Sequence, residues 1–229
     1  MIVCRTVNPE TLKLPTVTLL LYAPVEAPNL AALVLNKCQE KIAFGAVKLL
    51  SSSPPDIVGF QGDFVRVPLC SWAAGQQVQA YRLREFFDTE HMLLCETDGF
   101  VVNPRLWNPE WLKLDFIGAP WAPNSNPRQA NAPDHSRVGN GGFSLQSRRF
   151  RETLWENRER YKPGTPSDVW FGQDNDMLNI YQQKGLRLAT IHEAIRFSCE
   201  SEIPEYPDWS TNQSFGFHGR RLHPSLCPI

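Results

Sequence analysis

The sequence predicts an α/β fold in which a mostly parallel sheet is flanked by helices. Short runs rich in leucine and β-branched residues are bounded by turn-forming residues, which is typical of strands. Several of these runs are apolar throughout, as expected for strands that are covered on both faces of a parallel sheet. Segments of helical periodicity separate them. This order places a ligand site at the carboxyl ends of the strands.

In the first half of the chain, four strands are expected at residues 16–22, 46–51, 57–60 and 91–95. A helix is predicted over residues 30–44, where apolar side chains recur at helical spacing. Asn29 is its expected N-cap, and Gly45 is expected to end it. A second helix is predicted over residues 76–88 from the same periodicity. Strand, helix and strand then follow one another as in a βαβ unit.

In the second half, strands are expected at residues 116–119 and 142–146, and helices at residues 147–161 and 173–184. Prolines are concentrated between these segments and mark loops. The longest loop, residues 121–137, is polar and rich in asparagine and proline. A loop of this length within a compact domain is usually functional or mobile.

Composition excludes several classes of function. The chain has 229 residues, enough for one domain with its own core, and its net charge of -1 does not favour nucleic acid as a partner. The six cysteines lack CxxC spacing, which argues against zinc and favours reduced thiols. Without a secretory signal or an apolar window of about 18 residues, we expect a cytoplasmic protein with no transmembrane segment.

The strand at residues 91–95 runs directly into Glu96, Thr97 and Asp98. Two carboxylates at alternate positions lie on one side of the chain, at the sheet edge where a ligand site is expected. This arrangement suits a hard divalent cation, which could neutralise the phosphates of a nucleotide diphosphate. The alternative is a solvated turn built on Asp98 and Gly99.

A glycine cluster, Gly139 to Gly142, precedes the strand at residues 142–146. Glycine allows the backbone to approach a ligand closely. A phosphate-binding loop is disfavoured, because no Lys-Ser or Lys-Thr pair follows and the next element is a strand rather than a helix. A bulged entry into the strand remains the structural alternative.

Five motifs carry a resemblance to a known family: LLCETDGFVVNP (93–104), DFIGAPW (115–121), GNGGFSLQSRRF (139–150), PSDVWFGQDN (166–175) and SFGFHG (214–219). In this order they resemble the GT-A glycosyltransferase-like proteins of bacteria and fungi, a family catalogued as a domain of unknown function. The resemblance spans residues 81–219. It implies a GT-A (Rossmann-like) fold and a metal-dependent transfer of a sugar from a nucleotide diphosphate to an acceptor.

The resemblance also implies a division of labour along the chain. Residues from about 14 to 98 form the donor half, residues from about 99 to 219 the acceptor and catalytic half, and residues 220–229 a tail. The implied partners are a nucleotide sugar and a glycan or glycolipid acceptor, as in polysaccharide biosynthesis. Peripheral association with a membrane stays open.

The implied metal ion is Mn²⁺ or Mg²⁺, and the implied ligands come from the acidic motif and from a late histidine. Glu96, Thr97 and Asp98 occupy the family's Asp-x-Asp position. Because the first residue is Glu rather than Asp, Asp98 is expected as the direct ligand, with Glu96 on the metal, on a water or on the ribose. His218 is similar to the histidine that completes the metal shell in many such enzymes.

The implied catalytic base is Asp168 or Asp174, which removes the proton of the acceptor hydroxyl in an inverting transfer. The sequence does not favour one of these two candidates over the other. The alternative role for Asp174 is a favourable charge at a helix N-terminus. Retaining enzymes share the fold, so stereochemistry stays open.

Further contacts are expected from the glycine cluster, from aromatic residues and from one cation. Asn140, Gly141 and Gly142 are expected to contact sugar, and Trp121 and Trp170 to stack on it. Arg82 is expected to meet the donor phosphates, although a solvated helical face explains it equally well.

Two other functions compete with the transferase. One is a catalytically inactive GT-A-fold protein that binds carbohydrate or acts as a scaffold, because a fold does not guarantee activity. The other is a nucleotidyltransferase, which is disfavoured because residues 23–29 contain no Gly, Lys or Arg.

Overall fold

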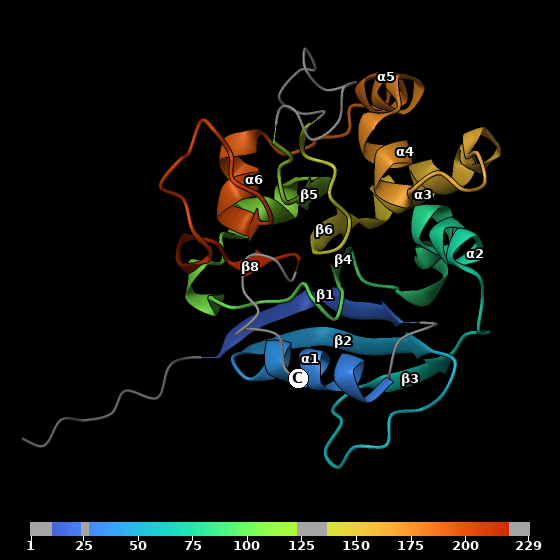
Figure 1. Ribbon diagram of the computed structural model, residues 1–229, viewed down its shortest axis with the longest axis vertical. Coiled ribbons are helices and arrows are strands. Elements are labelled where there is room, and N and C mark those ends of the chain that lie inside the picture. The colour runs from blue at the N-terminus through green and yellow to red at the C-terminus, as the bar shows by residue number, and fades with distance from the viewer. Residues whose placement is uncertain (1–10, 24–27, 123–136, 220–229) are drawn as a thin grey trace, which may run out of the picture.

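A six-stranded sheet forms the centre of the computed structural model, which describes residues 11–23, 28–122 and 137–219 (Figure 1). Its strands lie in the order β3-β2-β1-β4-β6-β5. Their bounds are β1 (Leu12–Ala23), β2 (Ile42–Ser51), β3 (Asp63–Arg66), β4 (His91–Cys95), β5 (Phe116–Gly118) and β6 (Ser144–Ser147). The pairs β1–β2, β2–β3 and β1–β4 are parallel, whereas β6 is antiparallel to both β4 and β5. The predicted mostly parallel sheet is confirmed.

Helices cover the sheet on both faces. They are α1 (Pro28–Gln39), α2 (Trp72–Gln77), α3 (Arg148–Glu156), α4 (Ser167–Gln173), α5 (Asn175–Gln183) and α6 (Ile191–Phe197). In Figure 1, α1 lies over β1 and β2, while α3, α4, α5 and α6 are grouped around β5 and β6. None of the helices in the described ranges is long and apolar enough to cross a bilayer.

The strand β4 is buried along its whole length. All its residues from His91 to Cys95 are buried, and Leu93 and Cys95 are fully enclosed. Leu93 packs in the main core with β1 and α1, whereas Met92 and Leu94 face a second core with Leu20. This two-sided burial explains why the strand is apolar from Met92 to Cys95. Its carboxyl end is therefore held rigidly.

A second, two-stranded sheet lies beside the carboxyl end of β4. Its strands are β7 (Ser198–Cys199) and β8 (Gly216–Phe217), which pair in parallel. Gly216 also forms a bridge with Val101, just after the acidic turn. Phe217 packs against Phe100 with ring centroids 4.8 Å apart. These contacts fix the C-terminal part of the described chain against the end of the central sheet.

The strand boundaries show where sequence patterns sufficed and where they failed. The strand predicted at residues 91–95 is confirmed residue for residue as β4. The strand predicted at residues 57–60 is wrong, because these residues form a turn and the strand β3 begins at Asp63. The predicted stop at Gly45 is also wrong. Gly45 lies inside β2, where a Cβ atom would fall on the carbonyl oxygen of Pro15. Close packing, not helix termination, requires glycine there.

The helix boundaries differ for similar reasons. The helix predicted over residues 30–44 ends at Gln39, and that predicted over residues 76–88 is α2 followed by a π-helical turn (Val78–Arg82) and a 3-10 turn (Leu83–Phe86). Those predicted over residues 147–161 and 173–184 appear as the shorter α3 and α5. The helices α4 and α6 were not predicted. The interior of the loop at residues 121–137 and the tail at residues 220–229 lie outside the described residues.

We expect Leu93→Ala to destabilise the protein by about 2–5 kcal/mol, since it leaves a cavity in a site with no exposed surface. Leu33→Ala on α1, where the side chain is 46% exposed, is the matched control and should cost less than about 1 kcal/mol. Urea unfolding followed by circular dichroism measures both. Equal costs for the two variants would contradict the assignment of β4 to the core.

Candidate functional site

The acidic motif forms a tight turn at the carboxyl end of β4. The backbone N–H of Glu96 donates to the carbonyl of Gly99 (3.0 Å), and that of Gly99 donates to the carbonyl of Glu96 (3.1 Å). Thr97 is buried in the turn, whereas the side chains of Glu96 and Asp98 are 31% and 26% exposed. The turn foreseen as an alternative therefore exists, but it directs its carboxylates into a partly enclosed site.

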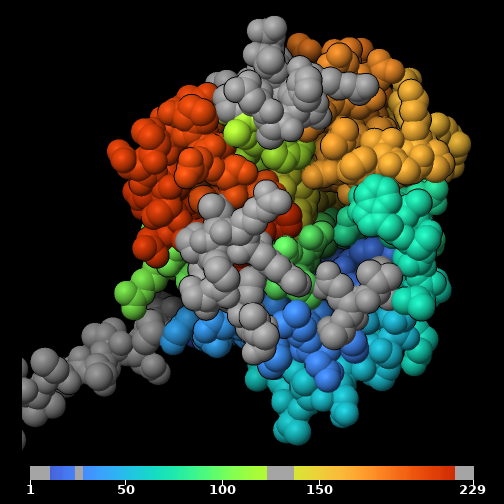
Figure 2. Space-filling model, in the orientation of Figure 1, coloured from blue at the N-terminus to red at the C-terminus, as the bar shows by residue number. Residues whose placement is uncertain are grey.

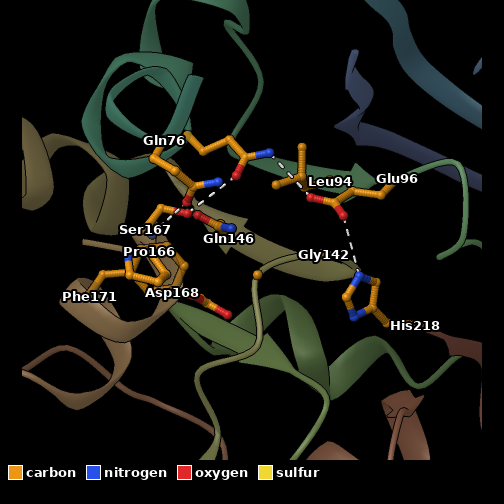
Figure 3. Close-up of a pocket in the computed structure, with 12 residues that line it drawn as sticks. Gln76, Leu94, Glu96, Gly142, Gln146, Pro166, Ser167, Asp168, Phe171 and His218 are labelled. Carbon is orange, nitrogen blue, oxygen red and sulfur yellow. Dashed lines mark hydrogen bonds and ion pairs between the residues drawn. The ribbon is translucent and has the colours of Figure 1, made fainter. Parts of the chain in front are cut away.

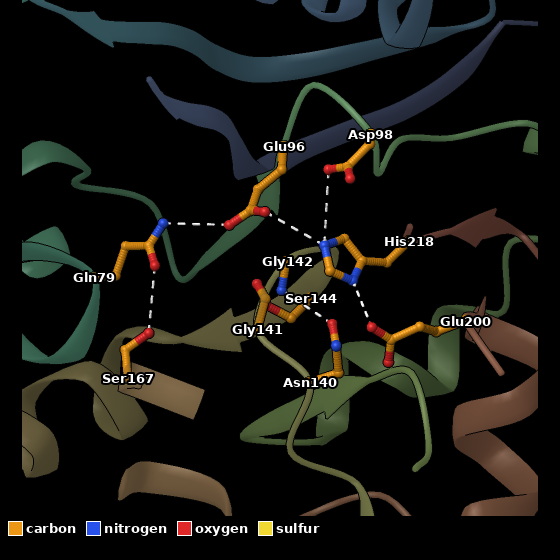
Figure 4. Close-up of polar contacts among 10 residues, drawn as sticks. All are labelled: Gln79, Glu96, Asp98, Asn140, Gly141, Gly142, Ser144, Ser167, Glu200 and His218. Carbon is orange, nitrogen blue, oxygen red and sulfur yellow. Dashed lines mark hydrogen bonds and ion pairs between the residues drawn. The ribbon is translucent and has the colours of Figure 1, made fainter. Parts of the chain in front are cut away.

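His218 is brought to this turn by the β7–β8 pair. Its backbone N–H donates to the carbonyl of Cys199 (2.9 Å), which continues the ladder by one residue. The imidazole Nε2 lies 3.3 Å from a carboxylate oxygen of Glu96 and 3.9 Å from one of Asp98 (Figure 4). Glu96, Asp98 and His218, hereafter the triad, therefore converge although 120 residues of sequence separate Asp98 from His218.

A second carboxylate holds the other face of the imidazole. Nδ1 of His218 lies 2.9 Å from Oε1 of Glu200, which follows β7 (Figure 4). The second oxygen of Glu200 is buried and has no hydrogen-bond partner among the described residues. When Nδ1–H donates to a carboxylate, the imidazole is fixed in the tautomer that presents Nε2 as a ligand atom. Sequence reasoning missed Glu200, because its pairing depends on a strand only two residues long.

Glycine is required where the backbone passes the imidazole. A Cβ atom on Gly142 would fall on Nε2 of His218, and one on Gly99 would lie 2.9 Å from its Cδ2. Both glycines thus allow the ring to reach the acidic turn. Gly142 is further fixed by its N–H, which donates to Oδ1 of Asn140 (3.0 Å). The glycine cluster was predicted to contact sugar, and the structure shows that its Gly142 leaves room for His218.

The triad has the composition of a metal site. Each member offers one ligand atom, and these atoms all lie within 4.8 Å of one another. Carboxylate oxygens suit Mg²⁺ and Mn²⁺, and an added imidazole favours Mn²⁺. The partly buried carboxylate of Glu200 behind the histidine is the arrangement that orients and strengthens histidine ligands in metal proteins. The residues present therefore fit a divalent cation.

The electrostatics of the triad reflect this convergence of charges. Burial alone would lower the pKa of His218, but hydrogen bonds to Glu200 and Glu96 outweigh it and raise that pKa well above its ordinary value. Burial alone would raise the pKa of Glu96, but hydrogen bonds from His218 and Gln79 outweigh it and lower that pKa. The charged forms of both groups are thus mutually stabilised.

A cavity of about 180 Å³ opens beside the triad (Figure 3). Glu96 and His218 line it together with Gly141, Gly142 and Asp168. In Figure 3, Asp168 and His218 approach the cavity from different elements, with Gly142 between them. In Figure 2, green atoms from the middle of the chain lie between the red C-terminal region and the teal region around α2. The cavity thus joins residues from both halves of the chain.

Asp168 is the titratable group that faces the triad across this cavity. It lies in the first turn of α4 and accepts a hydrogen bond from the N–H of Val169 (2.8 Å). Burial raises the pKa of Asp168 to about 6, and the nearby charges of Glu200 and Glu96 add to the effect. A carboxylate with a raised pKa in a cavity is a candidate for general base catalysis.

The other predicted site residues lie at various distances from this centre. Thr97, Asn140 and Gly141 belong to the segments that form it. Asp174 instead caps α5, where its side chain accepts from the N–H groups of Asp176 and Met177. It lines a separate hollow with Trp170. The structure therefore brings Asp168, but not Asp174, to the triad.

Two aromatic residues and one cation also lie apart from the cavity. Trp170 is buried and packs edge-on against Tyr161, with ring centroids 5.3 Å apart. Trp121 contacts the backbone region of Gly139, and its carbonyl accepts from Arg137. Arg82 forms an exposed ion pair with Glu85 (3.0 Å). None of the three lines the cavity formed by the described residues.

Comparison with solved structures identifies the fold. A glycosyltransferase involved in glycosylation of the major capsid of PBCV-1 superimposes with a TM-score of 0.51 and 12% identity, over 88% of this chain and 91% of that chain. An active-site mutant of the galactosyltransferase LgtC superimposes with a TM-score of 0.53 and 11% sequence identity, over 92% of this chain and 92% of that chain. For a mannosyltransferase of Pyrobaculum calidifontis, in complex with GDP-Man and Mn²⁺, the TM-score is 0.45 and the identity 16%, over 81% of this chain and 57% of that chain. The first two confirm the predicted α/β fold of GT-A type.

No curated protein matches the chain. A family model does match, over residues 79–218, a range that contains the acidic turn, the glycine cluster, Asp168 and His218. The match covers more than half of the chain. The chain therefore belongs to the family described as protein of unknown function DUF5672.

Proposed function

We propose that this protein is a metal-dependent glycosyltransferase that moves a sugar from a nucleotide diphosphate to an acceptor hydroxyl. The observation that carries the proposal is the triad at the carboxyl end of β4, beside a cavity that is lined by Glu96, His218 and Asp168. Ligands of open α/β sheets bind at this end of the strands. The fold shared with two glycosyltransferases supports the same reading.

The triad would hold the cation, Mn²⁺ or Mg²⁺, and with it the donor diphosphate. When bound, the ion supplies a Lewis acid that neutralises charge on the leaving diphosphate. Glu200 keeps the imidazole of His218 oriented for this role. The donor half, residues of about 14–98, and the acceptor half, residues of about 99–219, would then meet at the triad.

Asp168 would act as the catalytic base. It removes the proton of the acceptor hydroxyl while the acceptor oxygen bonds to the anomeric carbon and the bond from that carbon to the diphosphate oxygen breaks. Attack from the side opposite the diphosphate inverts the anomeric configuration. We assign Asp168 rather than Asp174 to this role, since Asp174 is committed to capping α5.

The acceptor would be a glycan or a glycolipid, as in the assembly of polysaccharides. Such a reaction is compatible with a cytoplasmic enzyme that associates peripherally with a membrane. The alternative is a GT-A-fold protein that only binds carbohydrate or acts as a scaffold. Such a protein needs no nucleotide, so calorimetric titration with nucleoside diphosphates distinguishes the two functions.

Asp98→Ala and His218→Ala are each expected to abolish Mn²⁺-dependent binding of a nucleoside diphosphate, because each removes a ligand of the cation. Isothermal titration calorimetry with UDP, GDP, ADP and CDP, in Mn²⁺ and in EDTA, measures this and identifies the base. Asp208→Ala, an exposed aspartate outside the cavity, is the control and should bind as the wild type does. If the wild type binds no nucleotide in Mn²⁺, the proposed function is wrong.

Glu200→Gln should weaken Mn²⁺ binding by about 10–100-fold, because the imidazole loses the carboxylate that orients it. Glu202→Gln, two residues along and exposed, is the matched control. Titration of Mn²⁺ by electron paramagnetic resonance reports the free ion directly. An unchanged affinity in Glu200→Gln would show that this carboxylate does not position the ligand.

Asp168→Asn should abolish transfer but leave binding of the Mn²⁺–nucleotide complex intact. It should also stabilise the protein. Because the pKa in the folded state is about 6 against an ordinary 3.8, the ionised carboxylate costs stability above pH 6. At about 1.4 kcal/mol per pKa unit, the gain at pH 7 is on the order of 1–3 kcal/mol.

Below pH 4 this gain should vanish, because wild-type Asp168 is then protonated in the folded state as well. Thermal unfolding at pH 7 and near pH 4 tests the difference, and wild-type turnover should fall as pH drops through about 6. Asp174→Asn is the comparison. A larger loss of turnover in Asp174→Asn than in Asp168→Asn would reassign the base.

A further inference from the structure

The cavity beside the triad has one wall made of neutral amides. The side chains of Gln76 and Gln79, from α2 and the π-helical turn that follows it, and of Gln146, from β6, all line it. We call these three residues the amide wall. Figure 3 shows Gln76, Gln146 and Ser167 on the same side of the cavity. None of the three glutamines was singled out from sequence.

Each amide of this wall is held in one orientation by the chemistry of its partner. Arg151 Nη1 donates to Oε1 of Gln146 (3.2 Å), and a guanidinium can only donate. The oxygen of Gln146 therefore faces Arg151, and its Nε2 donates to Ser144 Oγ (2.8 Å). The contacts of the described residues use only one of the two N–H bonds of this buried amide.

The other two amides are fixed in the same way. The N–H of Ser167 donates to Oε1 of Gln76 (2.7 Å), which leaves the Gln76 amide nitrogen without a protein partner in the described part of the chain. Nε2 of Gln79 donates to a carboxylate oxygen of Glu96 (3.2 Å), which can only accept. The wall thus presents oriented N–H donors toward the cavity.

Two carboxylates line the cavity, Glu96 and Asp168, and no lysine or arginine side chain lines it within the described ranges. The imidazole of His218 also lines it, but its charge is already shared between Glu96 and Glu200. Arg151 is fully buried behind Gln146, and it donates to Gln146 and to the carbonyl of Gln79 (2.9 Å). Its charge is therefore used to orient the wall rather than to receive a ligand.

This combination of groups matches hydroxyls better than carboxylates. A sugar hydroxyl both donates and accepts, so it can give a hydrogen bond to Glu96 or Asp168 and take one from an amide. A carboxylate on the sugar could only accept, and it would face the like charge of Asp168, which is unfavourable where water is excluded. The charge of Glu96 is already paired with His218 and, in the proposed complex, with the cation. Leu94 and Phe171 supply an apolar surface for the C–H face of a ring.

The volume indicates how much of the donor enters. At about 180 Å³ the cavity is smaller than the roughly 300–1,000 Å³ of pockets that enclose a whole drug-sized ligand. It suits one sugar ring rather than a complete nucleotide sugar. Because it lies between the triad and Asp168, the ring in question is the one that is transferred.

We propose that the amide wall makes this protein selective for donors whose transferred sugar is uncharged, and that it excludes sugars bearing a carboxylate. The inference rests on the proposed transferase function. Gln76 and Gln146 are the specificity-determining residues, since each offers an amide N–H that no described group uses.

Matched pairs of donors test the proposal by calorimetry in Mn²⁺. The bare nucleoside diphosphate is measured first, and then UDP-glucose against UDP-glucuronic acid and GDP-mannose against GDP-mannuronic acid, according to the base that binds. The neutral sugar nucleotide should bind at least tenfold more tightly than its acidic counterpart. Equal affinity, or tighter binding of the acidic donor, would overturn the inference while leaving the transferase proposal in place. If no diphosphate binds, both proposals fail.

Variants locate the discrimination in the wall. Gln76→Leu should lower affinity for the neutral sugar nucleotide about tenfold without changing affinity for the bare diphosphate, whereas Gln77→Leu, next in the same helix but outside the cavity, should change neither. Gln76→Arg should narrow the ratio between neutral and acidic donors, because it adds a cation. Gln146 is buried, so Gln76 provides the decisive variants if Gln146→Leu fails to fold. If the ratio of the affinities for neutral and acidic donors is unchanged in both Gln76 variants, the amide wall does not determine donor specificity.

Discussion

The imidazole of His218, held between Glu96 and Glu200, is the interaction on which the site depends. It joins the end of the central sheet to the small β7–β8 sheet, through contacts of 3.3 Å and 2.9 Å. Glu96 follows the central sheet and Glu200 follows the small sheet, and the imidazole is oriented only when both carboxylates contact it. Because charge-assisted hydrogen bonds in a partly buried setting are stronger than neutral ones, this bridge orients both halves of the site at once.

His218 can contact both carboxylates only because the backbone at Gly142 and Gly99 passes very close to its ring. Gly142 leaves room for Nε2, and Gly99 leaves room for the other edge of the ring. The same stretch of β6 that follows Gly142 pairs with β4, so the ring is located relative to the acidic turn by main-chain hydrogen bonds rather than by flexible side chains. A site built on strands in this way holds its geometry better than one built on loops alone.

Sequence alone predicted those features that depend on local pattern. The strand β4 is apolar from Met92 to Cys95 and lies between Glu90 and Glu96, so both its limits and the carboxylates that follow it could be predicted from the sequence. Features that depend on tertiary contact could not be predicted. Glu200 is brought to His218 by two paired strands of two residues each, which are too short to give a periodic pattern in the sequence. Gly45 does not end a helix; it is required because a Cβ atom there would overlap the carbonyl oxygen of Pro15. The glutamines of the wall carry no signal in the sequence, because two of them lie on a helical segment and Gln146 lies in a strand, and only the fold brings them to one cavity.

Two buried charges in and behind the cavity, on Asp168 and Arg151, lower the stability of the fold. Asp168 is ionised at neutral pH only against the cost of burial, and Arg151 is enclosed without a carboxylate partner among the described residues. Burying unpaired charges is unfavourable, so neither residue is explained by folding alone. Both become intelligible if Asp168 must accept a proton in the cavity and Arg151 must fix Gln146 at its wall. The burial of β4 supplies apolar stabilisation that offsets these costs, so that a buried strand leads directly into the polar site at its end.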